Sequence, residues 1–227
     1  MAKGIFITGT GTDVGKTYIT ALLVKRLQET GVMAAYYKAA VSGNQRQGQR
    51  LLPGDAMYVK KISGISQPLD TMVPYIYEQA VSPHLAARSE GNPVQLSVVR
   101  QGYLTLCQHY QYITMEGSGG ILCPLCWEEK RQLWLEDVIQ ELKLSCLVVA
   151  EAGLGTINAT LLTVEYLKAR QIAVKGIILN HFHNEDPMEQ DNCRVIEKKG
   201  GIPVIACVAK GDLDIEISAE KLMSFYS

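Results

Sequence analysis

The chain has 227 residues, of which 47% are apolar and 20% charged, and this composition excludes a disordered or fibrous protein. Lysine and arginine number 22 against 23 aspartates and glutamates, so we expect no broad basic face for nucleic acid or an anionic membrane. No apolar run approaches the ~18 residues of a membrane span, and the N-terminus lacks a secretory signal pattern. We expect a cytoplasmic protein whose residues 1–227 form one domain.

Short β-branched runs alternate with longer helical patterns along the chain. The first strand is expected at 4–8, then a helix over 15–30, a strand at 34–38 and a polar loop over 39–55. Four further strands are expected at 112–116, 146–150, 175–179 and 203–208, and four helices at 97–110, 133–143, 158–170 and 187–199. Such alternation is typical of a doubly wound α/β domain, with a mostly parallel sheet and helices on both faces.

Six cysteines are scattered along the sequence, and several lie within apolar strands. The pair Cys123 and Cys126 has the spacing of a metal or redox site, but no second CxxC and no HxxxH-type pair accompanies it. His181 and His183 are separated by one residue, and nothing else in the sequence supports them as a second pair of metal ligands. We therefore expect reduced cysteines that pack as small hydrophobic side chains.

A glycine-rich loop joins the first strand to the first helix, and it is the strongest motif in the sequence. Its residues run from Thr8 and Gly9 to Gly15, Lys16 and Thr17, one residue longer than the usual GxxxxGK(S/T) pattern. Backbone N–H groups at the start of a helix bind phosphate, and glycines let the backbone approach the anion closely. We expect a P-loop that binds a nucleoside triphosphate, with Lys16 on the β- and γ-phosphates.

Polar side chains follow other strands at the same predicted edge of the sheet. Thr17, Asp55 and Glu116 supply one hydroxyl and two carboxylates, a donor set that suits Mg²⁺ together with substrate phosphates. Either carboxylate alone is also consistent with a helix cap or a solvated charge. Lys38 ends the second strand, where an ammonium group would neutralise charge during phosphoryl transfer, and Ser42 follows it on a turn.

A second helix N-terminus follows the strand at 146–150, in the segment from Gly153 to Asn158. Its free N–H groups suit a carboxylate or a phosphate, although a simple turn capped by Thr156 or Asn158 explains the pattern equally well.

Together these motifs resemble the dethiobiotin synthetases over most of the chain, from Gly4 to about Lys210. The P-loop is followed by Lys38-Ala39-Ala40-Val41-Ser42-Gly43, similar to that family's KPxx(S/T)G, and by Asp55. Further segments then come in the family's order: Ser82-Pro83-His84, Glu116-Gly117-Ser118-Gly119-Gly120, the segment 152–158 and Asn180. The departures are Ala39 for proline, His181 for aspartate and Ala209 for proline.

The resemblance implies an ATP-dependent ligase that makes dethiobiotin from 7,8-diaminononanoate and CO₂, with release of ADP and phosphate. It implies that Lys38, Lys16 and Thr12 are catalytic and that Thr17, Asp55 and Glu116 hold Mg²⁺. It further implies a homodimer with shared sites, in which the diamine contacts Ser42 and the partner subunit's helix start at Gly155, Thr156, Ile157 and Asn158. The implied nucleotide-binding residues are Asp13, Val14, Gly15, Lys16, Thr17, Tyr18, Asp55, Glu116, Gly117, Ser118, Gly119, Asn180, His181, Ala209, Lys210 and Gly211.

Two other classes share part of this pattern. Cobyrinate-type amidoligases have a similar loop, but they add a glutamine-hydrolysing domain for which 227 residues leave no room. Partition-type switch ATPases carry an extra lysine near the start of the loop, where this sequence has Thr10, Gly11 and Thr12.

Overall fold

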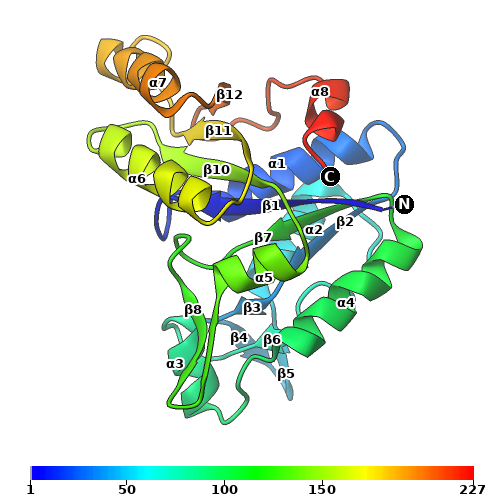
Figure 1. Ribbon diagram of the computed structural model, residues 1–227. Coiled ribbons are helices and arrows are strands. Elements are labelled where there is room, and N and C mark those ends of the chain that lie inside the picture. The colour runs from blue at the N-terminus through cyan, green and yellow to red at the C-terminus, as the bar shows by residue number, and fades with distance from the viewer. Residues whose placement is uncertain (1) are drawn as a thin grey trace.

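A six-stranded parallel sheet forms the centre of the computed structural model, which describes residues 2–227. Its strands run in the order β12-β11-β10-β1-β7-β2, so the first strand of the chain lies in the middle (Figure 1). Their bounds are β1 (Lys3–Gly9), β2 (Ala34–Lys38), β7 (Tyr112–Glu116), β10 (Cys146–Glu151), β11 (Val174–Asn180) and β12 (Val204–Val208). All six predicted strands are therefore confirmed, and so is the doubly wound α/β fold.

Helices cover both faces of the sheet and separate two apolar cores. One core holds buried side chains of α1, α2 and α8, and the other holds side chains of α4, α5, α6 and α7. Figure 1 shows α4, α5 and α6 in front of the sheet and α1 and α2 behind it. The bounds are α1 (Lys16–Gln28), α2 (Gly54–Ser63), α3 (Pro83–Ser89), α4 (Leu96–His109), α5 (Leu135–Glu141), α6 (Thr156–Ala169), α7 (Pro187–Gly200) and α8 (Ala219–Ser224).

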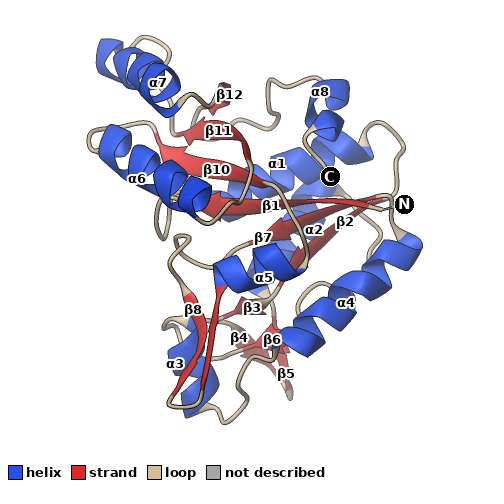
Figure 2. Cartoon of the chain, viewed as in Figure 1, coloured by secondary structure: helices blue, strands red, loops and turns tan. Residues whose placement is uncertain are grey.

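Two segments differ from the elements expected there, and α3 and α8 lie where no helix was expected. The expected loop over 39–55 contains three short strands, β3 (Ala40–Val41), β4 (Gln45–Gln47) and β5 (Arg50–Leu52), and α2 begins at its end. The helix expected from residue 133 begins two residues later, because β9 (Arg131–Trp134) pairs with β8 (Pro124–Glu128) in a hairpin. Figure 2 shows these small strands gathered beside the central sheet, where β3 pairs with β6 (Tyr75–Ile76).

The outer edge of β2 is closed by a side chain instead of another strand. The buried amide of Gln67 accepts a hydrogen bond from the Tyr36 N–H at 2.8 Å and donates one to the Tyr36 carbonyl at 3.0 Å. The Lys38 N–H donates to the carbonyl of Met72 at 3.0 Å, just after the 3₁₀ turn Leu69–Thr71. These bonds satisfy backbone groups that an uncovered edge would leave unpaired.

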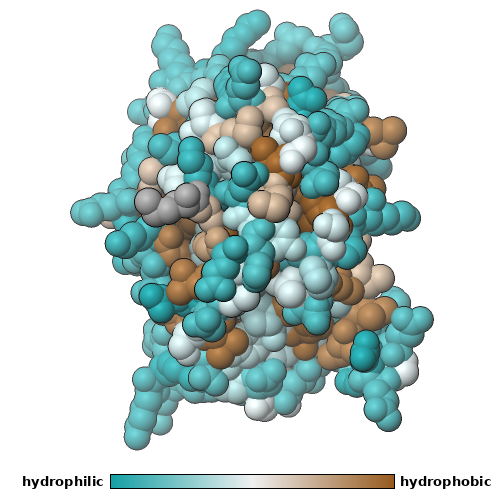
Figure 3. Space-filling view, turned by 90° about the vertical axis from the view of Figure 1, so that its right-hand side faces the viewer, coloured by the Kyte–Doolittle hydropathy of each residue, from teal (hydrophilic) through white to brown (hydrophobic). Residues whose placement is uncertain are grey.

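One face of the surface is largely polar. Figure 3 shows this face, on which hydrophilic residues surround scattered hydrophobic ones. The longest helices of the described chain, α4, α6 and α7, have 14 residues each, and none of its helices is long and apolar enough to span a bilayer.

Replacement of Gln67 by alanine should lower the free energy of unfolding by about 2–4 kcal/mol, since it leaves buried backbone groups unpaired and a cavity beside them. Urea denaturation followed by circular dichroism measures this. The exposed Gln101→Ala in α4 serves as the control and should change stability by less than about 0.5 kcal/mol. Equal effects of the two substitutions would contradict the assigned role of Gln67.

Candidate active site

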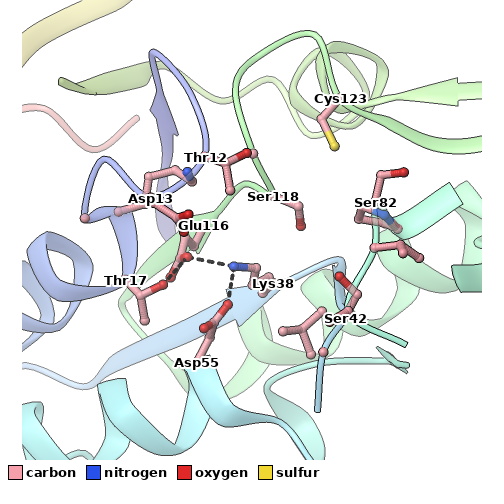
Figure 4. Close-up of a pocket in the computed structure, with 18 of the residues that line it drawn as sticks. Thr12, Asp13, Thr17, Lys38, Ser42, Asp55, Ser82, Glu116, Ser118 and Cys123 are labelled. Atoms are coloured by element: carbon pink, nitrogen blue, oxygen red, sulfur yellow. Dashed lines mark hydrogen bonds and ion pairs between the residues drawn. The ribbon is translucent and has the colours of Figure 1, made fainter. Parts of the chain in front are cut away.

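A cavity of about 790 Å³ opens at the carboxyl ends of the central strands. Its wall is built from the P-loop, the end of β2, the start of α2, and the loops at 41–43, 80–83 and 116–119 (Figure 4). This is the edge at which open α/β sheets bind ligands. Twelve of the predicted site residues line the cavity: Thr12, Asp13, Gly15, Lys16, Thr17, Tyr18, Lys38, Ser42, Asp55, Glu116, Ser118 and Gly119.

The P-loop holds its shape through its own backbone and one buried asparagine. Gly15 caps α1 with a φ of 84°, a left-handed conformation that glycine adopts without strain. The Lys16 ammonium folds back to donate to the Gly11 carbonyl at 2.8 Å. The side-chain amide of Asn180, at the end of β11, donates to the Val14 carbonyl at 3.1 Å, and this hydrogen bond ties the P-loop to the sheet. The first N–H groups of α1 are left for an anion.

Four side chains from four elements meet at the floor of the cavity. The Lys38 ammonium lies 2.6 Å from Asp55 Oδ2 and 2.7 Å from Glu116 Oε1. The Thr17 hydroxyl donates to the same Glu116 oxygen at 2.7 Å. Figure 4 shows Lys38 between the two carboxylates, with Thr17 on the far side of Glu116. Sheet register explains the pairing, because Lys38 stands directly opposite Glu116 on the neighbouring strand β7.

The charges of this cluster are strongly coupled. Burial alone would lower the pKa of Lys38, but Glu116 and Asp55 outweigh it and raise that pKa above its usual value. The pKa of Lys16 is lowered by burial first and by the nearby Lys38 charge second. Lys38 therefore stays protonated at working pH, held by two carboxylates in a site with little access to water.

The oxygen atoms of this cluster fit a hard divalent cation. Asp55 and Glu116 offer two carboxylates that converge on the Lys38 ammonium, and Thr17 offers a hydroxyl beside the same Glu116 oxygen. Across residues 2–227 there is no group of three or more histidine, cysteine, aspartate or glutamate side chains arranged to hold a metal. The hydroxyl and the two carboxylates are donors of the kind that Mg²⁺ takes, since it is commonly bound by one or two carboxylates and completed by water and phosphate oxygens.

The opposite wall of the cavity is less charged. Ser42, Ser82 and Cys123 line it together with small apolar residues, and Figure 4 shows them apart from the Lys38 cluster. Burial raises the pKa of the Cys123 thiol to about 11, so it remains a neutral wall group. Cys123 and Cys126 are both buried and unbonded to each other, in agreement with the expected packing role.

Several predicted residues lie outside this wall. The Gly117 N–H donates to the Ile7 carbonyl, and the Val14 carbonyl accepts from Asn180, which acts on the P-loop instead of the cavity. His181 follows with a φ of 54° and lies 2.9 Å from Glu151 through Nδ1. Ala209, Lys210 and Gly211 form a turn near the start of α1, where the Tyr18 hydroxyl donates to the Ala209 and Asp212 carbonyls.

The segment Gly155, Thr156, Ile157 and Asn158 is also absent from the cavity wall. It forms the start of α6, with Gly155 in a left-handed conformation (φ 90°) and the exposed Leu154 before it.

Two buried residues of the site carry no motif and escape sequence reasoning. The Tyr36 hydroxyl donates to Glu116 Oε2 at 3.0 Å, and Gln67 holds the Tyr36 backbone. The available signal is strand alternation, which places Tyr36 on the same face of β2 as Lys38.

The sequence similarity of this chain to known proteins shows its family. A family model described as an AAA domain matches residues 3–213. The ATP-dependent dethiobiotin synthetase BioD of Clostridium botulinum (strain 657 / Type Ba4) is 47% identical over 226 residues, covering 100% of this chain and 99% of the relative. The protein of the same name from Brachyspira hyodysenteriae is 43% identical over 95% of this chain and 96% of its own length. The chain belongs to the dethiobiotin synthetase family.

Solved structures place this dethiobiotin synthetase family member in the P-loop fold. A ParA family ATPase from Chlorobium tepidum superimposes with a TM-score of 0.58 at 14% identity, over 99% of this chain and 90% of that one. The MinC:MinD cell division complex of Aquifex aeolicus gives 0.56 at 18% identity, over 92% and 82%. At such low identity the likeness concerns the fold alone.

Substitution of Gly15 by alanine should weaken ADP binding at least about tenfold, because the added Cβ would lie 2.0 Å from the Asn180 side chain and strain a left-handed backbone. The loop must shift, and its N–H groups then lose alignment with the phosphates. Isothermal titration calorimetry measures the affinity. Gly153→Ala is the control, since its Cβ would meet nothing within 4 Å. Binding to Gly15→Ala within twofold of the original chain would refute this account of the loop.

Proposed function

We propose that this chain is an ATP-dependent dethiobiotin synthetase, a ligase that converts 7,8-diaminononanoate and CO₂ into dethiobiotin with release of ADP and phosphate. The observation that carries the proposal is the Lys38 ammonium held beside Glu116, Asp55 and Thr17 at the end of a P-loop cavity. Relatives at 42–47% identity that bear this enzyme's name support it.

ATP is the nucleotide that this cavity is proposed to take. The N-terminus of α1 and the backbone of Gly15 would bind the β-phosphate. Lys16 would leave the Gly11 carbonyl and reach the β- and γ-phosphates. The turn at Ala209 to Gly211, tied to α1 through Tyr18, supports a place for the base beside Asn180.

Thr17, Asp55 and Glu116 are proposed to hold Mg²⁺, which when bound neutralises charge on the β- and γ-phosphates. In this arrangement the Lys38 ammonium would give up its contact with at least one carboxylate. A lysine side chain is flexible enough to turn from Asp55 toward a γ-phosphate bound in the cavity.

The chemistry begins when one substrate amine adds to CO₂ and loses a proton, giving a carbamate. A carbamate oxygen then attacks the γ-phosphorus and ADP leaves, which forms a mixed carbamic–phosphoric anhydride. The second amine attacks the carbonyl carbon, loses a proton and expels phosphate, closing the five-membered ureido ring. Lys38 would stabilise the carbamate and the transferring phosphoryl group, and close placement of the second amine makes ring closure intramolecular.

The two lysines of the cavity wall, Lys16 and Lys38, are assigned to the phosphates and the carbamate, so the substrate's far carboxylate needs another partner. The start of α6, from Gly155 to Asn158, supplies the backbone N–H groups of Ile157 and Asn158, whereas the Thr156 N–H already donates to the Gly153 carbonyl; this helix start lies outside that wall. We assign this helix start to the site of a second copy, so that two chains form a homodimer with two shared sites.

Neither alternative class is favoured. The partition-type ATPases match through the fold alone, at 14–18% identity, and the named relatives at 42–47% identity are dethiobiotin synthetases rather than amidoligases.

ADP release from Mg-ATP and bicarbonate should depend on 7,8-diaminononanoate, with one dethiobiotin formed per ADP. A coupled spectrophotometric assay follows ADP, and mass spectrometry follows the product. ADP release at the same rate without the diamine would overturn the ligase proposal and favour a switch ATPase.

Within the same assay, Lys38→Ala should abolish turnover because no ammonium remains to stabilise the transferring phosphoryl group. ADP binding, measured by calorimetry, should remain within a few-fold, since Lys38 makes no contact with the P-loop backbone. Full turnover in Lys38→Ala would remove this role.

Mixed dimers test the shared site. Lys38→Ala and Asn158→Glu should each be inactive, the latter because a negative charge at the helix start repels the substrate carboxylate. After denaturation and joint refolding in equal amounts, half of the dimers would be mixed, each with one intact site. Activity should return to about a quarter of the original. No return of activity, with dimers present by ultracentrifugation, would contradict sharing of the site.

A further inference from the structure

Both oxygens of the Glu116 carboxylate are engaged, and they face different partners. Oε1 accepts hydrogen bonds from Lys38 and Thr17 at 2.7 Å each. Oε2 accepts one from the Tyr36 hydroxyl at 3.0 Å. The side chain of Glu116 is fully enclosed, so water does not replace a missing partner there. The direction of Oε1 toward the cavity therefore depends on what holds Oε2.

Tyr36 reaches Glu116 because of the register between β2 and β7. Lys38 stands opposite Glu116, and Tyr36, two residues earlier, stands opposite Thr114. Tyr36 and Lys38 thus share one face of β2, and both reach the same carboxylate, one directly and one diagonally. Lys38 approaches from the cavity, whereas Tyr36 approaches from the core beneath it.

Tyr36 is itself held firmly. Its side chain is fully buried, and the Gln67 amide fixes its backbone on the open edge of the sheet. Burial and the adjacent Glu116 charge raise the pKa of Tyr36 well above its usual value. The hydroxyl faces a carboxylate oxygen, which accepts hydrogen bonds, so Tyr36 is the donor of this bond.

We propose that Tyr36 is a positioning residue for the metal site, donating to Glu116 Oε2 so that Oε1 stays directed at Thr17 and the bound Mg²⁺. This inference rests on the proposed function, which makes Glu116 a metal ligand. Without the hydroxyl, the carboxylate is free to rotate and to pair both oxygens with Lys38. That pairing would favour the ammonium over the metal, because it strengthens the contact that Mg²⁺ must displace.

Tyr36→Phe and Tyr37→Phe form a matched pair of test variants. Both tyrosines are fully buried and each loses one hydroxyl, but Tyr37 lies on the other face and donates to the Val99 carbonyl. Mg²⁺ is titrated by calorimetry into each protein saturated with ADP, so neither the diamine nor turnover is needed. Tyr36→Phe should bind Mg²⁺ about tenfold more weakly, as is usual when a ligand loses its supporting hydrogen bond. Tyr37→Phe should stay within twofold of the original chain.

Binding of ADP in EDTA supplies the readout for a purely structural effect, and it should be unchanged in both variants. Mg²⁺ affinity of Tyr36→Phe within twofold of the original would overturn the inference. Equal weakening in both variants, or a loss of ADP affinity in EDTA as large as the loss of Mg²⁺ affinity, would also overturn it. Failure of the original chain to bind Mg²⁺ removes the metal site together with the inference, whereas diamine-dependent ADP release tests the ligase separately.

Discussion

The buried ion pair between Lys38 and Glu116 is the interaction on which the rest of the site depends. An ammonium group with this little access to water is stable only when carboxylates surround it, and removal of one partner of a buried pair costs about 3–5 kcal/mol. Asp55 from α2, Thr17 from α1 and Tyr36 from β2 complete the ring of contacts. The pair therefore connects side chains from the P-loop helix, α2 and two neighbouring strands.

The same pair links the structure to its proposed chemistry. Lys38 occupies the point on which the Asp55 and Glu116 carboxylates converge, so binding of Mg-ATP would place a second cation where the ammonium now neutralises these carboxylates. The displaced ammonium would then lie beside the transferring phosphoryl group, where positive charge lowers the barrier. A preformed cluster of this kind costs little reorganisation during the reaction, because its members are already held by β2, β7 and two helix starts.

Sequence reasoning predicted the parts that follow simple local rules. Apolar runs gave all six central strands, and Gly15, Lys16 and Thr17 identified the phosphate loop through its strand and helix context. The strand β3 was missed because it pairs with the distant β6, and the hairpins β4–β5 and β8–β9 were missed because their strands, of 3 to 5 residues, are too short to show a clear alternation. Tyr36 and Gln67 were missed for a related reason: which neighbour a buried side chain meets depends on strand register, and register is set by the whole sheet.

Transfer of the γ-phosphoryl group to a carbamate oxygen is the central claim, and the fate of that oxygen tests it directly. Turnover with ¹⁸O-labelled bicarbonate, ATP and the diamine should release phosphate that carries one labelled oxygen, because the carbamate oxygen that attacks phosphorus leaves with it. Mass spectrometry of the phosphate after a short reaction measures this. Phosphate without label, formed together with dethiobiotin, would contradict the account.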